Sequence, residues 1–263
     1  MEPGQSEEVR ALRAALDPAI AARVTNGAEL VRAVARRRRE ATLSTGVEAL
    51  DTLLGGGLAR GKMTELAGRG ERYSIVIAAL AAATSIGEAA ALIDLGDSFD
   101  PQLGEAAGID LRRMLWVRPH TMKQAVMAAE MIGATGVQFV ALDAGLPPLR
   151  GKRVPDASWV RLARVAESHG CTILVSAPYP VTGTTSEAMV QTYAARAKWL
   201  GSGRSPRVLA GVEARLRLEK HRHKRTGESG GVFFSTSEQL AASSEQVAGA
   251  ASSRSPLAAR CSL

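Results

Sequence analysis

Residues 61–75 have the types and spacing of a phosphate-binding loop placed between a strand and a helix. Such a loop, G-x-x-x-x-G-K-[ST], surrounds phosphates with backbone N–H groups, while its Lys neutralises the phosphates and its hydroxyl binds Mg²⁺. An ungapped alignment of this pattern starts at Gly68. It replaces the second Gly, the Lys and the hydroxyl residue by Tyr73, Ser74 and Ile75. The segment therefore has the layout of a phosphate site without its cation.

The residues of this degenerate loop that could still contact a phosphate are Gly68, Arg69, Gly70, Arg72 and Ser74. With one residue deleted, Ser74 aligns with the hydroxyl position, but Tyr73 then takes the place of the Lys. Arg69 or Arg72 could supply the missing charge, although an arginine in an exposed loop is more often solvated. We therefore expect no nucleotide or other cofactor at this loop.

Two aspartates lie at the ends of apolar segments that are typical of buried strands. Residues 89–95 contain Asp94, and residues 137–142 are followed by Asp143. Carboxylates at the carboxyl ends of parallel strands can bind a metal ion. Because no Lys or Glu accompanies them, we favour a structural role in which they cap neighbouring helix amides.

Histidines and cysteines do not form a metal-binding or disulfide pattern. His221 and His223 share one face of a predicted strand, but they have no third ligand and lie among positive charges. Cys171 and Cys261 have no CxxC or Cys/His spacing. We expect neither a metal site nor a disulfide framework.

Strands and helices alternate through the middle of the sequence. Predicted strands cover residues 63–67, 89–95, 114–117, 137–142 and 171–177, with helices at 74–86, from 100, and at 121–132 and 159–168. Unbroken apolar strands that alternate with helices predict a mostly parallel α/β sheet covered on both faces. After Pro178 we expect a helix at 187–200 and an edge hairpin that joins residues 214–220 to 232–234.

Composition divides the chain into an N-terminal helical arm at 1–42, a core at 43–235 and a Ser/Ala-rich tail at 236–263. The tail has few large apolar residues and is expected to be disordered. In the arm, Val9, Leu12 and Leu16 form the apolar stripe of a short amphipathic helix. An apolar stripe on a detached helix indicates a partner groove, so we expect these residues to bind a partner.

Positive charge is concentrated in two short runs, Arg36, Arg37, Arg38, Arg39 and Lys220, Arg222, Lys224, Arg225. The remaining 25 Lys and Arg residues are balanced by 26 Asp and Glu residues, so the body of the protein is near neutral. Each run is either a solvated end of an element or a contact for nucleic acid or an acidic partner.

No apolar run approaches the roughly 20 residues that cross a bilayer. Glu7 and Glu8 lie where a signal peptide would be basic and then apolar. We therefore expect a cytoplasmic protein.

Several separated motifs resemble the entry to the ATPase core of the RecA recombinase family. They are Thr45-Gly46 with Leu50-Asp51, the glycines at 55–57, Thr64-Glu65-Leu66 with Gly68, residues 91–94 followed by Asp100-Pro101, and the Walker B-like residues 140–143. The resemblance covers roughly residues 43–234 and implies a RecA-like core.

The sequence departs from the RecA pattern at the positions that perform catalysis. Gly96 stands where RecA has the glutamate that activates the attacking water, and the loop Lys is absent. The two DNA-binding loops of RecA would fall near 147–156 and 178–187, and both are short here. Loss of the phosphate cation and the general base removes two large electrostatic contributions to phosphoryl transfer. We therefore expect no ATPase activity.

A RecA-like sequence with a degenerate nucleotide site most resembles the ImuA family, through the motif that runs from Thr45 to Leu66. ImuA proteins are accessory factors of the bacterial mutasome, which carries out translesion synthesis in the SOS response to DNA damage. The resemblance implies a non-catalytic adaptor in DNA repair and mutagenesis that binds RecA, the polymerase homologue ImuB, or a second copy of itself, and that modulates RecA filaments.

Three other interpretations remain open at this point. The protein could be an ATP-dependent, DNA-binding recombinase paralogue with unconventional nucleotide contacts. It could be related in function to the shorter SulA cell-division inhibitors. As an addition to the adaptor role, the two basic runs could bind DNA weakly and without sequence preference.

Overall fold

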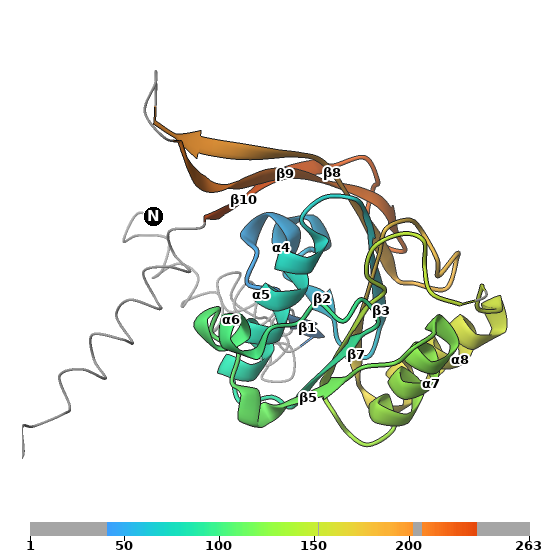
Figure 1. Cartoon of the computed structure of the whole chain (residues 1–263). Helices are drawn as coiled ribbons and strands as arrows, with labels where there is room; N and C mark the ends of the chain where they lie inside the picture. The colour runs from blue at the N-terminus through green and yellow to red at the C-terminus, as the bar shows by residue number, and fades with distance from the viewer. Residues whose placement is uncertain (1–40, 152, 202–206, 236–263) are drawn as a thin grey trace, which may run out of the picture. The chain divides into compact units, whose positions relative to one another are not determined.

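A mostly parallel sheet with buried strands forms the centre of the fold, as the sequence predicts (Figure 1). The computed structural model describes residues 41–151, 153–201 and 207–235. Its parallel strands are β3 (Met63–Gly68), β4 (Ala90–Asp94), β5 (Met114–Val117), β6 (Phe139–Asp143) and β7 (Thr172–Ala177). Every residue of β3, β4, β6 and β7 is buried, because helices cover both faces of these strands.

Five α-helices are described: α4 (Glu48–Leu54), α5 (Arg72–Ser85), α6 (Pro101–Ala106), α7 (Met122–Gly133) and α8 (Asp156–His169). Helices α4 and α5 pack on one face of the sheet, where Ile75 and Leu80 meet strand residues such as Leu92. Helices α7 and α8 cover the other face, where Val126 and Leu162 are buried. None of the described helices has the length and apolar character needed to span a membrane.

The Thr45-Gly46 and Leu50-Asp51 motif is a clamp that fixes the start of α4. The Asp51 carboxylate accepts hydrogen bonds from Thr45 Oγ1 at 2.7 Å and from Ser44 Oγ at 2.6 Å. Helix α4 ends at Gly55, whose φ of 87° is the left-handed conformation that glycine adopts most readily. Leu50 is buried beneath the clamp, so this motif supports the sheet directly.

The expected helix at 187–200 is wrong, because this segment is strand β8 (Ala188–Leu200). It pairs in parallel with β3 and antiparallel with β9 (Val208–His221), and β9 pairs antiparallel with β10 (Ser229–Ser235). The alanines suggested a helix, but Val190 and Thr192 alternate with more exposed residues in the strand pattern. Hydrogen bonding to the free edge of β3 therefore decides the conformation of this segment, and its weak helix propensity does not.

The expected hairpin at the edge of the sheet is confirmed as β9 and β10. The full strand order is β10-β9-β8-β3-β7-β6-β4-β5 among the described residues, and a separate pair is formed by β1 (Thr42–Leu43) and β2 (Leu58–Ala59).

Val9, Leu12, Leu16 and the first basic run, Arg36 to Arg39, lie outside the described residues, as does the expected tail from Thr236. The proposed division into three segments, with its two boundaries, stays a prediction.

Candidate functional site

The loop between β3 and α5 contains only Arg69, Gly70 and Glu71. Helix α5 begins at Arg72, two residues earlier than expected, so Arg72 and Tyr73 belong to its first turn. Gly68 ends β3 with a φ of 123°, and a Cβ atom there would lie 2.1 Å from the carbonyl oxygen of Thr192. The close approach of β8 therefore requires glycine at the point where the chain leaves the strand.

The Arg72 guanidinium is buried and bonded inside the protein, contrary to the expectation of a solvated loop arginine. Its side chain is 6% exposed. Nε donates to the Gly68 carbonyl at 2.5 Å, and Nη1 donates to Ser176 Oγ at 2.7 Å. Nη2 donates to the Gly145 carbonyl at 3.0 Å, and Nη1 lies 3.4 Å from Asp143 Oδ1. Burial lowers the pKa of Arg72, while its contact with Asp143 opposes that shift.

Asp143, the Walker B-like aspartate, is the centre of this buried network. Its Oδ1 accepts from Ser176 Oγ at 2.7 Å, and its Oδ2 accepts from the Gly145 amide at 3.1 Å. Burial raises the pKa of the Asp143 carboxyl, and the hydrogen bond from Ser176 and the charge of Arg72 oppose the rise. Both carboxylate oxygens thus have protein partners.

The other acidic residues at the carboxyl ends of the strands cap local backbone. Asp94 Oδ2 accepts from the amides of Ser98 and Phe99 at 2.8 and 2.9 Å, and Asp100 caps α6 by accepting from Gln102 and Leu103. Oδ1 of Asp94 is buried without a partner among the described residues. No group of three or more His, Cys, Asp or Glu side chains in the described part of the chain is arranged to bind a metal ion.

Gly96 lies in close backbone contact with Gly145. A Cβ atom on Gly96 would be 2.9 Å from the Gly145 Cα, and one on Gly145 would be 2.7 Å from the Gly96 Cα. Contacts this short require one backbone to move. The position that carries a glutamate in the RecA pattern is therefore closed by the segment that follows β6.

The remaining loop positions also differ from those of a phosphate site. Ser74 Oγ donates to Glu71 Oε2 at 2.6 Å, so its hydroxyl is engaged within its own helix turn. Arg69 is exposed and makes no hydrogen bond or ion pair within the described residues. The Tyr73 hydroxyl is buried without a partner there, and burial and then the charge of Asp94 raise its pKa.

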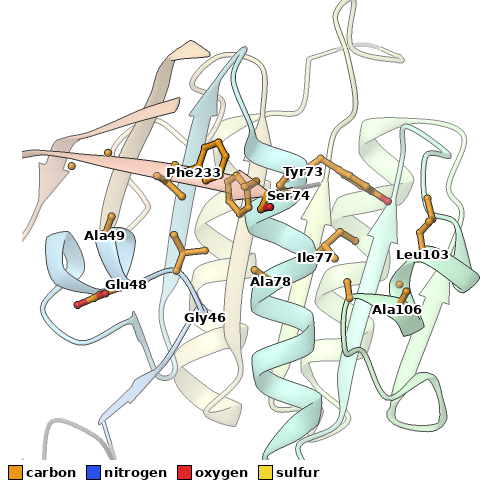
Figure 2. A pocket seen from close by; sticks show the side chains of 18 of the residues that line it. Gly46, Glu48, Ala49, Tyr73, Ser74, Ile77, Ala78, Leu103, Ala106 and Phe233 are labelled. Carbon is orange, nitrogen blue, oxygen red and sulfur yellow. The ribbon is translucent and has the colours of Figure 1, made fainter. Parts of the chain in front are cut away.

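A cavity of about 1030 Å³ lies beside the first half of α5. Figure 2 shows Tyr73, Ser74 and Ile77 of α5 facing it, with Leu103 of α6 on another wall. Val232 and Phe234 of β10, which pack against the core, also belong to its lining. Two carboxylates, Glu48 and Asp100, are part of the lining, and no Lys or Arg belongs to it among the described residues. The cavity offers aromatic and acidic contacts but no cation for a phosphate.

The second basic run is not a uniform exposed patch. Lys224 Nζ donates to the carbonyls of Leu53 and Thr52 at 3.0 and 3.4 Å, where it caps the C-terminus of α4. Lys220 Nζ donates to Ser186 Oγ at 3.3 Å. Lysine side chains of this run therefore hold neighbouring segments together.

Arg222 of this run and the neighbouring His223 approach one nearly buried carboxylate, that of Glu187. Arg222 lies 3.7 Å from Glu187, and His223 Nε2 lies 3.4 Å from the same carboxylate. Burial lowers the pKa of the neighbouring His221. Arg225 is exposed and has no hydrogen bond or ion pair within the described residues. Within this run, Arg225 is the side chain most available to a partner.

Glu65 is a buried residue whose role the sequence did not reveal. Its Oε1 accepts from the Val181 and Thr182 amides at 2.5 and 3.3 Å, and its Oε2 accepts from Thr182 Oγ1 at 2.5 Å. The residue thereby fixes the short segment that follows β7. The only available signal was a charged side chain inside an otherwise buried strand.

Comparison with known proteins gives the same family as the motifs. A family model described as the RecA N-terminal domain matches residues 10–149, about half of the chain. The chain is 30% identical over 141 residues to Protein RecA of a Synechocystis strain, which covers 52% of the chain and 40% of that protein. It is 35% identical over 105 residues to Protein RecA of Chlorobaculum tepidum, which covers 38% of the chain and 30% of that protein. The chain thus spans less than half the length of these relatives.

Proposed function

The chain belongs to the RecA N-terminal domain family, and we propose that it is a non-catalytic member that acts as a protein adaptor. The observation that carries this proposal is the Arg72 guanidinium, which bonds Gly68, Ser176 and Gly145 beside Asp143. A buried cation with these partners is held by the protein and not by a nucleotide. A phosphate group could use it only if the internal network opened.

The electrostatic requirements of phosphoryl transfer support the same proposal. Stabilisation of the transferring phosphoryl group needs a cation near the β- and γ-phosphates, and the attacking water needs a positioned base. The loop has Tyr73 and Ser74 where the cation would be, and Ser74 donates to Glu71. Gly96 provides no base, and its contact with Gly145 leaves no room for one.

The adaptor that the sequence resembles most is ImuA, so the finer proposal is a role in damage-induced translesion synthesis. In this role the protein binds RecA and an ImuB-like polymerase homologue and modulates RecA filaments. The motif from Thr45 to Leu66 supports this assignment, as does the combination of a RecA-type family match with the internally bonded Arg72. The stripe Val9, Leu12 and Leu16 is the proposed contact with RecA or with a second copy of the chain.

Titration of the full chain with a fluorescent ATP analogue and Mg²⁺ tests the non-catalytic part of the proposal. We expect no saturable binding at micromolar protein concentrations. The alternative, a recombinase paralogue with unconventional contacts, predicts micromolar, Mg²⁺-dependent binding that is lost when Arg69 and Arg72 are both changed to alanine. That result would replace the adaptor by an ATP-dependent enzyme.

A binding experiment with RecA filaments and with the ImuB-like protein tests the partners separately. Capture of RecA by the full chain should weaken when residues 1–17 are deleted, because the deletion removes the Val9, Leu12 and Leu16 stripe. A matched variant with these three residues changed to serine should weaken capture to the same extent. Unchanged affinity in both variants would rule out this route of contact.

A further inference from the structure

Among the described residues, the sheet formed by β8, β9 and β10 has one face covered by helices and one face on which no helix packs. Ala214, Leu216 and Leu218 of β9 point toward the core and pack with α4 and its neighbours. In Figure 1, α4 and α5 lie beneath these three strands, and none of the described helices lies against their other side. Residues that alternate with this buried row therefore form an outer face, which we call the outer β-face.

Positive and aromatic side chains are interleaved on the outer β-face. Arg215 and Arg217 alternate with the buried leucines on β9, and both are exposed. The register pairs Arg215 with Tyr193 of β8 and places Phe233 of β10, which is 51% exposed, opposite Glu213. Alternate strand residues are about 6.8 Å apart, so the two arginines form a regularly spaced row.

Further cations on the same face lie around Glu213, the carboxylate at its centre. Lys198 forms an ion pair with Glu213 at 2.7 Å, and the register places Arg196 opposite Glu213. The hydrogen bond from Lys198, and then the charges of Lys198, Arg215 and Arg196, lower the pKa of Glu213. Arg217 lies 3.4 Å from Glu219. The other two arginines, Arg196 and Arg215, have no hydrogen bond or ion pair within the described residues. The face therefore keeps a net positive charge.

The middle of the outer β-face lacks the apolar centre of a protein interface. Across from the two arginines, β10 presents Ser229 and Gly231, and β8 presents Gln191 beside Tyr193. Protein interfaces bury an apolar core inside a polar rim. Among the described residues, the exposed apolar side chains Trp199, Leu200 and Val208 lie at the far end of β8 and β9, away from Arg215 and Arg217. Cations that track a backbone, together with rings on which bases stack, are the features of sheets that bind single strands.

We infer that the outer β-face binds single-stranded nucleic acid, with Arg215 and Arg217 on the phosphates and Phe233 and Tyr193 stacked on bases. This site is independent of the adaptor role proposed above. It also differs from the two basic runs, since none of its residues belongs to Arg36–Arg39 or to the run from Lys220 to Arg225. DNA and RNA share the recognised chemistry, and the experiment compares them.

Fluorescence anisotropy with labelled oligothymidylate and oligouridylate measures the binding of the full chain. The double variant R215E/R217E should weaken binding by about tenfold or more and reduce the slope of log affinity against log salt by about 1.4, the value for two phosphate contacts on a single strand. The matched control R112E/R113E makes the same charge change on the loop before β5, at the opposite edge of the sheet. It should stay within about twofold of the unmodified chain, because its arginines lie far from the outer β-face.

A second arm of the experiment separates stacking from charge. Phe233→Leu keeps an apolar side chain but removes the ring, so affinity should fall by about fivefold or more while the salt slope is unchanged. Both comparisons are repeated with Arg36, Arg37, Arg38 and Arg39 changed to glutamine, which removes the contribution of that run. If R215E/R217E does not fold, R215Q/R217Q takes its place, and melting temperatures check each variant.

Three results would overturn the inference. The full chain could fail to bind either oligonucleotide at low salt. The R215E/R217E variant could bind as well as R112E/R113E in both backgrounds. Finally, R215E/R217E could lose RecA capture while its oligonucleotide binding is unchanged, which would assign the outer β-face to a protein partner.

Discussion

Arg72 is a buried charged residue whose hydrogen-bond partners are brought together by the fold. A buried guanidinium is costly unless its donors are matched, and here Gly68, Ser176, Gly145 and Asp143 surround it. These four partners lie close to the carboxyl ends of three parallel strands, with Gly68 on β3, Asp143 and Gly145 at the end of β6, and Ser176 on β7. The arginine therefore joins three strand ends by hydrogen bonds.

Replacement of Arg72 by methionine should destabilise the protein by about 3 kcal/mol, because it leaves the Asp143 carboxylate buried without its cation. Urea unfolding measures the change. Arg69→Met, in the loop just before Arg72, is the matched control, and it should stay within about 0.5 kcal/mol of the unmodified protein because Arg69 is exposed. A small effect of the Arg72 change would mean that the internal network adds little to stability.

Asp143 predicts a distinct pH dependence of stability. Burial raises its folded pKa above the ordinary value of 3.8, so the folded state binds this proton more tightly than the unfolded state does. The contribution of this carboxyl to the free energy of unfolding is therefore largest below its unfolded pKa and falls as the pH rises through the folded pKa. The difference in unfolding free energy between the unmodified protein and Asp143→Asn, measured by urea unfolding across this range, should decrease as the pH rises. A constant difference would contradict the direction of the shift.

Gly96 gives a steric prediction at the same site. Gly96→Ala should destabilise the protein by about 1–3 kcal/mol, since the added methyl meets the Gly145 backbone. Gly231→Ala makes the same change where no atom lies within 4 Å and should have little or no destabilising effect. Thermal unfolding of the two variants checks the contrast, and equal melting temperatures would show that the segment after β6 yields easily.

At the scale of elements, β8 determines what the other segments can do. It pairs with β3, its Thr192 carbonyl crowds Gly68, and it carries the chain into the hairpin that displays the outer β-face. Hydrogen bonds to the Glu65 carboxylate hold the segment that joins β7 to β8. This segment is thus attached to the core.

Glu65→Ala should loosen this connection specifically. Hydrogen exchange of the Val181 and Thr182 amides should accelerate, and the protein should lose about 1–3 kcal/mol because charge-assisted hydrogen bonds are removed. Glu105→Ala, on the exposed face of α6, is the control and should leave both amides protected. Equal exchange in the two variants would show that the segment is held by other contacts.

Elements and site differ in how far the sequence could predict them. Apolar runs such as residues 139–142 were sufficient to predict parallel buried strands, because burial on both faces leaves a clear pattern. The segment 188–200 was misassigned because its pairing partner, not its own propensity, decides its structure. The role of Arg72 was not predictable, since Ser176 and Gly145 lie about 100 and 70 residues away and only the fold brings them together.

At the scale of the whole molecule, the RecA-type sheet carries surfaces of different chemical character. The cavity beside α5 is lined by aromatic and acidic residues, while cations occupy the outer β-face and the end of α4. Within the described residues, the cavity lining therefore contains no cation, and the positive charges at the degenerate loop are those of Arg69 and the buried Arg72. In the proposed adaptor role, the charged surfaces would contribute specificity toward a partner.

Addition of MgATP should therefore leave the melting temperature of the full chain unchanged. A ligand present at about 100 times its Kd stabilises a folded protein by about 2.7 kcal/mol, so even modest binding would be visible as a shift of several degrees. Differential scanning fluorimetry with millimolar MgATP, and with MgCl₂ alone as the control, makes the measurement. A shift specific to MgATP would show that a nucleotide reaches the folded protein.

The contact between Gly96 and Gly145 has an evolutionary consequence. A mutation that placed a glutamate at position 96 would first have to displace the backbone after β6, and a lysine restored to the loop would face the charge of Arg72. In the non-catalytic protein that we propose, each single step toward an ATPase would lower stability before it gave any activity. Loss of hydrolysis after descent from a nucleotide-hydrolysing ancestor would then be difficult to reverse. Relatives that share this glycine pair and arginine should not regain hydrolysis by one substitution.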